Sequence, residues 1–324
     1  MYHIIVNPTA GHGRSKDILE PLAKGLDGHG KEFEILRTEA SMDARRMAKE
    51  ACEKKSDGII AIGGDRTLQE IVMGMRESSP ESFNIPVFLG ILPCGSGNDY
   101  ALTYGGKQKF NGGGASKKNN INNKVSSCVK NIIEGNTVPI DLIRVSGKMV
   151  CRSSMQTFTE NTCINIANIG LDARIVYNAA ALKKKFGRYA YLAAAYKSIS
   201  QHKNASLRIE ADGKDYDGEY TLLALCNGQY YGGGLRISPS ARLDDGLITL
   251  CKIEGMSRPK TMVLFPSILF EKHINIKSVG YINCKKVNVF VKDGEVLCID
   301  GNLYEAEGGI SFEIMPGALR MFLP

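Results

Sequence analysis

A short apolar stretch, a glycine turn and an amphipathic segment constrain the fold of this chain most. Gly58–Ile62 is apolar and rich in β-branched residues, which is typical of a buried strand. The turn Gly63-Gly64-Asp65-Arg66-Thr67 follows directly. Beyond the turn, apolar residues recur at helical spacing, at Leu68, Ile71, Val72 and Met75. The sequence therefore predicts a strand, a tight turn and the N-terminus of a helix.

Such a turn is typical of a site for an anion. Glycines allow backbone to approach a ligand closely, and the N–H groups and dipole of the first helical turn favour phosphate. Asp65 is a carboxylate in the same turn. A carboxylate beside bound phosphate is understandable if a cation lies between them.

The first hundred residues alternate between strand and helix patterns. Strands are expected at His3–Val6, Glu32–Arg37, Gly58–Ile62 and Val87–Leu92, and helices at Ser15–Leu26, 41–54 and 67–76. This alternation predicts a parallel sheet with helices on both faces, in which ligands bind at the carboxyl ends of the strands. Glycine loops follow three of these strands, at Asn7–Gly13, Gly63–Thr67 and Pro93–Asp99.

The second half of the chain has a different character. Residues 105–124 are polar and glycine-rich, and we expect a mobile loop there, followed by a helix over Val125–Ile133. Short alternating strands then predict an antiparallel sandwich or barrel, interrupted by helices near Leu182–Ser200 and Lys260–Phe270. The strands are expected at Asp141–Val145, Asn161–Ile169, Leu207–Ala211, Tyr220–Cys226, Leu247–Ile253, Lys286–Val291 and Ile310–Ile314.

Composition narrows the class of protein. The 324 residues are 43% hydrophobic and 23% charged, which is ordinary for a globular chain of two domains. No apolar run reaches the roughly 18 residues of a membrane span, and Pro8 interrupts the opening run too soon for a signal peptide. The 9 cysteines include no Cys-x-x-Cys pair, so we expect reduced core thiols and a cytoplasmic location.

The net charge of +7 is concentrated in one segment. No acidic residue lies between Asp172 and Glu210, whereas eight lysines and arginines do, at Arg174, Lys183, Lys184, Lys185, Arg188, Lys197, Lys203 and Arg208. This segment reads either as a solvated helix face or as a peripheral contact with an anionic membrane. The helix over Leu182–Tyr196 is correspondingly either core-packing or lipid-facing. No nucleic-acid-binding module is visible.

Several motifs together resemble the diacylglycerol kinase catalytic-domain family, which includes bacterial lipid kinases and sphingosine kinases. The resemblance covers most of the chain, and Leu92–Ala101 is its most specific stretch. The other matching motifs, in family order, are Asn7-Pro8 with Gly11, Thr38, Gly63–Thr67, Asp141, Asn168–Ala173, Asn227 with Gly232–Gly234, Pro239–Leu247 and Asp300-Gly301.

The resemblance implies a Rossmann-like α/β domain of the NAD kinase and diacylglycerol kinase type over residues 1–140, with 316–324 returning to it. An antiparallel β-sandwich domain over 141–315 would bind the lipid alcohol. The implied reaction is Mg²⁺-dependent transfer of the γ-phosphoryl group of ATP to a lipid hydroxyl, with Asp300 as general base. The implied nucleotide contacts are Asn7, Thr38, Gly63, Gly64, Asp65, Arg66, Thr67, Gly95, Ser96 and Asn98, and the implied metal ligands are Asp65, Asp99, Asp141, Asp244 and Asp245. The sequence leaves the oligomeric state open, a homodimer included.

Each aspartate also has a simpler interpretation. Asp99 could cap a helix, Asp141 could end a strand, and Asp245-Gly246 and Asp300-Gly301 could be plain turns.

Two positions depart from the family pattern. Arg66 stands where the family has glycine, and Asn302 replaces a glutamate. A positive φ at Arg66 would cost about 1 kcal/mol, and its guanidinium would either fill or bind the phosphate space. A nucleotide- or lipid-binding protein with little turnover is therefore the alternative to a lipid kinase. A soluble-substrate kinase, such as an NAD kinase, shares the Gly-Gly-Asp turn but not the later loops.

Overall fold

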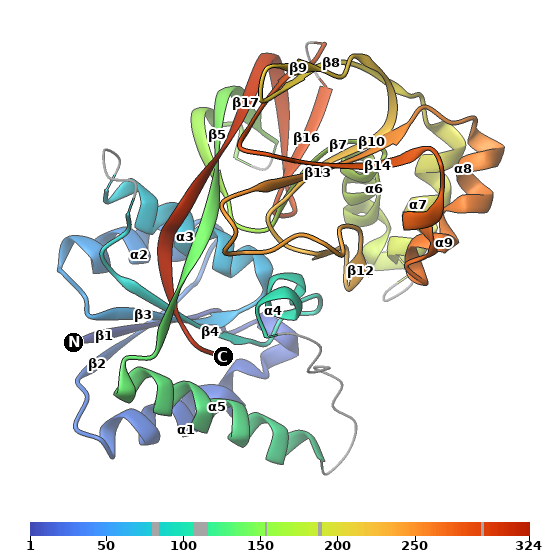
Figure 1. Cartoon of the computed structure of the whole chain (residues 1–324). Coiled ribbons are helices and arrows are strands. Elements are labelled where there is room, and N and C mark those ends of the chain that lie inside the picture. The colour runs from blue at the N-terminus through green and yellow to red at the C-terminus, as the bar shows by residue number, and fades with distance from the viewer. Residues whose placement is uncertain (80–83, 106–115, 153, 187–189, 293–294) are drawn as a thin grey trace. The chain divides into compact units, whose positions relative to one another are not determined.

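The computed structural model describes residues 1–79, 84–105, 116–152, 154–186, 190–292 and 295–324 (Figure 1). The chain divides into two compact units, residues 1–142 with 315–324 and residues 143–314. It passes from one unit to the other within β5 (Thr137–Cys151) and within β17 (Asn302–Phe322). Within the described part of the chain, no helix is both long enough and apolar enough to span a bilayer.

The first unit is a parallel sheet in the order β4-β3-β1-β2, and the end of β17 extends it beside β4 through Met321 and Leu89. Helices α1 and α5 cover one face, and α2 and α3 the other (Figure 1). Its elements are β1 (Tyr2–Val6), η1 (Ala10–Gly13), α1 (Ser15–Asp27), β2 (Phe33–Arg37), α2 (Asp43–Glu53), β3 (Gly58–Gly63), α3 (Asp65–Glu77), β4 (Phe88–Pro93), α4 (Asp99–Tyr104) and α5 (Ser116–Glu134). The predicted α/β fold is confirmed.

The apolar periodicity of the sequence explains these elements. All of β1 and β3 is buried, as expected for strands covered on both faces. Ile18, Leu22 and Leu26 form the buried face of α1. The expectation for residues 105–124 was wrong in part, because residues 116–124 form the first turns of α5. Residues 106–115 lie outside the described residues.

The second unit is antiparallel, with strands in the order β14-β13-β10-β7-β16-β17 and further strands β5, β6, β8, β9 and β15. One apolar core lies within these strands, and a second lies between the sheet and the helices. Its remaining elements are β6 (Thr157–Cys163), β7 (Ile166–Gly170), α6 (Leu171–Phe186), α7 (Ala190–Gln201), β8 (Ala205–Ala211), β9 (Lys214–Asp215), β10 (Gly218–Cys226), β11 (Tyr230–Tyr231), β12 (Leu235–Arg236), β13 (Ile248–Glu254), α8 (Arg258–Leu264), α9 (Pro266–Leu269), η3 (Lys272–Asn275), β14 (Val279–Cys284), β15 (Lys286–Phe290) and β16 (Glu295–Ile299).

The predicted β-sandwich is confirmed, with two corrections. The single strand expected at Asn161–Ile169 is divided into β6 and β7, and strands β14 and β16 were not predicted. All nine cysteines are buried free thiols, as expected of core residues. Arg188 and Tyr189, of the basic segment, lie outside the described residues.

Candidate functional site

The glycine loops after β3 and β4 lie against each other. A Cβ atom added at Gly95 would lie 2.5 Å from the Cα of Gly64, and one added at Gly63 would lie 2.5 Å from the Cβ of Thr67. The Cys94 N–H donates to the carbonyl of Gly63 over 2.8 Å. Glycine at position 95 therefore allows the two loops to approach this closely, and the approach of their backbone to a phosphate stays a prediction.

The loop after β1 joins them. The side-chain amide nitrogen of Asn7 donates to the Thr67 hydroxyl at 3.2 Å. The side-chain oxygen of Asn7 accepts hydrogen bonds from the backbone N–H and the hydroxyl of Thr9. Gly11 has a φ of +59°, and a Cβ there would collide with the Cys94 carbonyl oxygen. Three loops at the carboxyl edge of the sheet therefore meet, as the sequence predicted.

Asp65 and Asp99 approach the second loop from two helices. The Tyr100 N–H donates to one oxygen of Asp65 at 3.0 Å. A Cβ at Gly97 would lie 3.1 Å from the other oxygen of Asp65 and 3.3 Å from an oxygen of Asp99. Asp65 therefore already anchors the start of α4, and both carboxylates lie beside Gly97.

Asn98 shapes the same loop from within. It adopts a left-handed conformation with a φ of +58°, and its amide nitrogen donates to the Gly95 carbonyl at 3.0 Å. Its side-chain oxygen is buried and has no hydrogen-bond partner in the described part of the protein. Asn98, Gly63, Gly64 and Asp65 line a small cavity of about 20 Å³. A buried oxygen without a donor fits a site that binds a polar ligand.

The remaining predicted nucleotide contacts lie around this edge. Thr38 follows β2, is half-buried, and its N–H donates to the carbonyl of Val6 at 2.9 Å. Ser96 is exposed at the second loop. Loops of this kind could hold phosphate through backbone N–H groups, and Asp65 and Asp99 could hold Mg²⁺ through water.

The backbone of Arg66 does not have a positive φ. Arg66 lies in the first turn of α3 and is exposed. The concern about a strained φ was therefore wrong. Its charge lowers the pKa of Glu70, but burial of Glu70 is the larger effect and raises that pKa.

Asp141 lies in β5 and is 3% exposed. Its carboxylate accepts a hydrogen bond of 2.7 Å from the Gly317 N–H, so its visible contact holds the last segment of the first unit. Among the residues that the structure describes, no three His, Cys, Asp or Glu side chains converge as metal ligands. A metal role for Asp141 stays a prediction.

Replacing Asp141 with alanine should lower the free energy of unfolding by about 1–3 kcal/mol, because the part-buried Gly317 N–H loses its acceptor. Asp141→Asn keeps an acceptor oxygen and should lose less. Denaturant unfolding measures both. Equal stability of both variants and the wild type would contradict the anchoring role, whereas a raised Mg²⁺ requirement in a stable Asp141→Asn variant would support metal binding.

The predicted second metal site is exposed. Asp244 forms an ion pair with Arg242 at 3.1 Å, and Asp245 accepts a hydrogen bond from the Leu247 N–H. Gly246 has a φ of +69°. These contacts are those of a turn, and a structural metal at Asp244 and Asp245 stays a prediction.

Asp300 lies in the second unit, in the turn between β16 and β17. Its carboxylate accepts hydrogen bonds from the N–H groups of Ile164, Asn165 and Ile166 at 2.8, 2.9 and 3.0 Å. The thiol of Cys163 lies 3.3 Å from one oxygen and donates to it. Burial raises the pKa of Asp300 to about 6, although these donors lower it. Such a carboxyl is poised to exchange a proton near neutral pH.

Sequence reasoning missed the residues that support Asp300. The gap between β6 and β7 presents the three N–H groups of residues 164–166, and a single polar residue, Asn165, is all that marks this gap in the sequence. Asp172 lies in the motif Asn168–Ala173, but the sequence predicted no function for it. It is 1% exposed, and burial raises its pKa to about 7.

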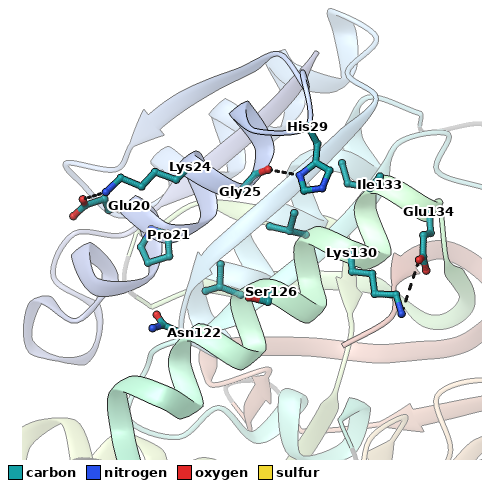
Figure 2. A pocket seen from close by; sticks show the side chains of 12 residues that line it. Glu20, Pro21, Lys24, Gly25, His29, Asn122, Ser126, Lys130, Ile133 and Glu134 are labelled. Carbon is teal, nitrogen blue, oxygen red and sulfur yellow. Dashed lines mark hydrogen bonds and ion pairs between the residues drawn. The ribbon is translucent and has the colours of Figure 1, made fainter.

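A larger hollow lies away from the predicted residues. It has a volume of about 750 Å³, lies between α1 and α5, and includes Pro21, Gly25 and Ile133 (Figure 2). Ion pairs between Lys24 and Glu20 and between Lys130 and Glu134 border it. None of the predicted nucleotide or metal residues lines this hollow, so its size does not make it the reaction site.

Comparison with known proteins agrees with the motif set. The sequence profile of the diacylglycerol kinase catalytic domain matches residues 1–145, and that of the YegS C-terminal NAD kinase beta sandwich-like domain matches residues 165–323. A diacylglycerol kinase of Bacillus subtilis (strain 168) is 27% identical over 299 residues, 92% of this chain and 88% of that protein. A diacylglycerol kinase of Staphylococcus aureus (strain bovine RF122 / ET3-1) is 29% identical over 92% of this chain and 84% of that protein.

Solved structures show the same fold. The crystal structure of a candidate diacylglycerol kinase from Bacillus anthracis str. Sterne aligns with a TM-score of 0.71 at 24% identity, covering 100% of this chain and 97% of that one. By the two profile matches, residues 1–145 belong to the diacylglycerol kinase catalytic-domain family, and residues 165–323 match the β-sandwich-like domain that follows it.

Proposed function

We propose that this protein is a lipid kinase that transfers the γ-phosphoryl group of Mg-ATP to the hydroxyl of a lipid such as diacylglycerol. The observation that carries the proposal is the meeting of three glycine loops at one sheet edge, in a chain of this family. Phosphoryl transfer depends mostly on positioning and charge neutralisation, and such loops supply backbone N–H donors for both.

The chain's own residues divide the chemistry between them. The loops at Gly63–Thr67 and Gly95–Asn98 bind and orient the phosphates. Asp65, Asp99 and Asp141 would hold Mg²⁺, which neutralises developing phosphate charge when bound. Asp300 accepts the proton of the lipid hydroxyl as that oxygen forms its bond to phosphorus, and ADP is the leaving group. The backbone donors at residues 164–166 hold the carboxylate of Asp300 in place.

A cytoplasmic protein that works at the surface of an anionic membrane fits this substrate, since diacylglycerol resides in the bilayer. The basic segment between Asp172 and Glu210 supports this location by its charge.

The direct test is ATP-dependent phosphorylation of diacylglycerol in mixed micelles, with NAD as a competing acceptor. Labelled phosphatidic acid supports the proposal. Nucleotide binding without any phosphorylated lipid would support the binding-only alternative, to which the uncharged Asn302 points. Phosphorylated NAD without phosphorylated lipid would overturn the lipid substrate.

Arg66→Gln should weaken ATP binding by up to about fivefold, because an exposed charge contact contributes about 0.2–1 kcal/mol. Glutamine keeps the helix propensity of arginine, so α3 should persist. Isothermal titration with ATP measures the change, and Arg46→Gln on α2 is the matched exposed control. Tighter ATP binding with faster turnover in Arg66→Gln would instead mean that the guanidinium obstructs the phosphate space.

A further inference from the structure

Four large apolar side chains are exposed within a short stretch of the second unit. Val263 is 77% exposed and Phe270 is 70% exposed, and Met262 and Ile274 are exposed beside them in sequence. They come from α8, the end of α9 and η3, which pack on one another. We call Met262, Val263, Phe270 and Ile274 the α8–η3 surface. Gathered apolar exposure of this kind marks an interaction site rather than ordinary surface variation.

The stretch is anchored, so this exposure is not the result of a loose segment. Thr261, Phe265, Ile268 and His273 alternate with the exposed residues and are buried. His273 also contacts the Ile237 carbonyl oxygen at 3.1 Å. The buried residues hold the backbone to the core and leave the α8–η3 surface facing outward.

Helix α7, which packs beside α8, adds a partly exposed tyrosine next to the α8–η3 surface. Tyr196 on α7 packs its ring edge-on against Phe265, with 6.3 Å between ring centroids, and is 43% exposed. Tyrosine rings with one apolar and one wet side are favoured at membrane–water interfaces.

Positive charges predominate in the stretch that carries the α8–η3 surface. Lys260, Lys272 and Lys277 are exposed in the same stretch. The single acidic residue between Gly255 and Lys285 is Glu271, and its carboxylate is paired with Arg236 at 3.0 Å. Lysines placed among exposed apolar side chains match the headgroup layer of an anionic bilayer.

We propose that the α8–η3 surface docks on an anionic lipid bilayer, with Val263 and Phe270 inserted below the headgroups and the three lysines at the lipid phosphates. A bilayer fits better than a second copy of the chain, because two copies of a surface in which positive charges predominate repel each other. The proposal concerns a different surface from the basic segment at 172–210. It holds whether or not the protein phosphorylates lipid, so a failed kinase assay leaves it intact.

The absence of tryptophan from the sequence permits a clean test of insertion. Phe270→Trp introduces a single indole into the α8–η3 surface. Vesicles of phosphatidylcholine with about 30% phosphatidylglycerol should shift its emission to shorter wavelength, because the indole leaves water. Met155→Trp is the matched control, since Met155 is 75% exposed and lies outside this surface. Its emission should not shift.

Vesicle flotation separates the apolar and electrostatic parts. Val263→Ser with Phe270→Ser should weaken binding at least about tenfold, because the inserted apolar area is lost. Each of Lys260→Ala, Lys272→Ala and Lys277→Ala should weaken binding about fivefold, at roughly 1 kcal/mol per lysine. Added salt should weaken binding of the wild type. Far-UV circular dichroism confirms that the variants remain folded.

Three results would each overturn the proposal. The first is an equal emission shift at Phe270→Trp and Met155→Trp, and the second is vesicle binding that the serine and alanine substitutions leave unchanged. The third is a wild-type dimer in sedimentation velocity that Val263→Ser with Phe270→Ser converts to a monomer without changing vesicle binding, because a second copy would then cover this surface.

Discussion

Asp300→Asn should lower kcat for lipid phosphorylation by about 100- to 10,000-fold, the range over which a positioned general base contributes. The carboxylate is held by three backbone N–H donors and the Cys163 thiol, so the base is already oriented. Asparagine cannot accept the proton of the hydroxyl. ATP binding should change little, because Asp300 is not among the predicted nucleotide contacts. Steady-state kinetics and titration with ATP measure the two effects.

The same carboxyl sets the expected pH dependence. Burial raises the pKa of Asp300 to about 6, so kcat should rise with pH through about 6 and level off above it. The contribution of Asp300 to folding stability changes with pH in the opposite direction. A carboxyl whose pKa is higher in the folded than in the unfolded state favours folding when protonated, and this contribution is lost as pH rises from about 4 through about 6. A rate that is flat across this range would contradict the role of Asp300 as base.

The chain contains a matched control for the Asp300 substitution. Asp212 also precedes a glycine, also has a positive φ, of 46°, and also accepts hydrogen bonds from two backbone N–H groups, those of Lys285 and Lys286. Asp212→Asn, at an exposed position, should therefore change the same kind of backbone hydrogen bonds without the loss of kcat. Equal losses in both variants would mean that Asp300 supports the fold and not the reaction.

Gly95→Ala should weaken ATP binding more than tenfold and lower the free energy of unfolding by about 1–3 kcal/mol, the usual cost of forcing atoms into a packed region. The new Cβ would lie 2.5 Å from the Gly64 Cα, and this closest neighbour is backbone, which cannot move aside as a flexible side chain can. The two loops must then separate, and the N–H groups that face phosphate move with them. Titration with ATP measures the loss of affinity, and denaturant unfolding measures the loss of stability.

Gly90→Ala is the control for that substitution, because Gly90 lies in β4, the strand that leads into the same loop. A Cβ there meets Phe322 at 3.5 Å, an ordinary contact. This variant should bind ATP as the wild type does. Normal ATP affinity in Gly95→Ala would show that the close approach of the loops is not needed for the nucleotide.

The regular alternation of strands and helices was predictable because apolar periodicity survives in each element of the first unit. Helix α5 shows where that signal is too weak. Its first turns are rich in lysine and asparagine and read as loop, yet Val125 and Val129 are buried between α5 and α1. A Cβ at Gly25 of α1 would collide with Val129, so a glycine on the partner helix allows the close packing. Contacts between helices, and not local preference, determine this element.

The sequence predicted the parts of the site that lie within recognisable motifs, and not the contacts between distant segments. Glycines and aspartates marked the loops, because their chemistry is local. The helical backbone of Arg66 and the bond between Asp141 and Gly317 depend on tertiary structure. The break after Cys163 is marked in the sequence only by Asn165 between two isoleucines, which is too weak a signal to separate two strands, and this break presents N–H donors to Asp300.

The pairing of Met321 with Leu89 has a consequence for biosynthesis. Tyr104 donates to the Phe322 carbonyl at 2.6 Å, and Asn131 donates to the Leu323 carbonyl at 3.0 Å. These pairs are 218 and 192 positions apart, so the first unit needs residues made long after its own strands. On the ribosome, the edge of β4 stays unpaired while the whole second unit is synthesised. Unpaired strand edges promote aggregation, so this chain should depend on chaperones during translation more than a protein whose first domain closes by itself.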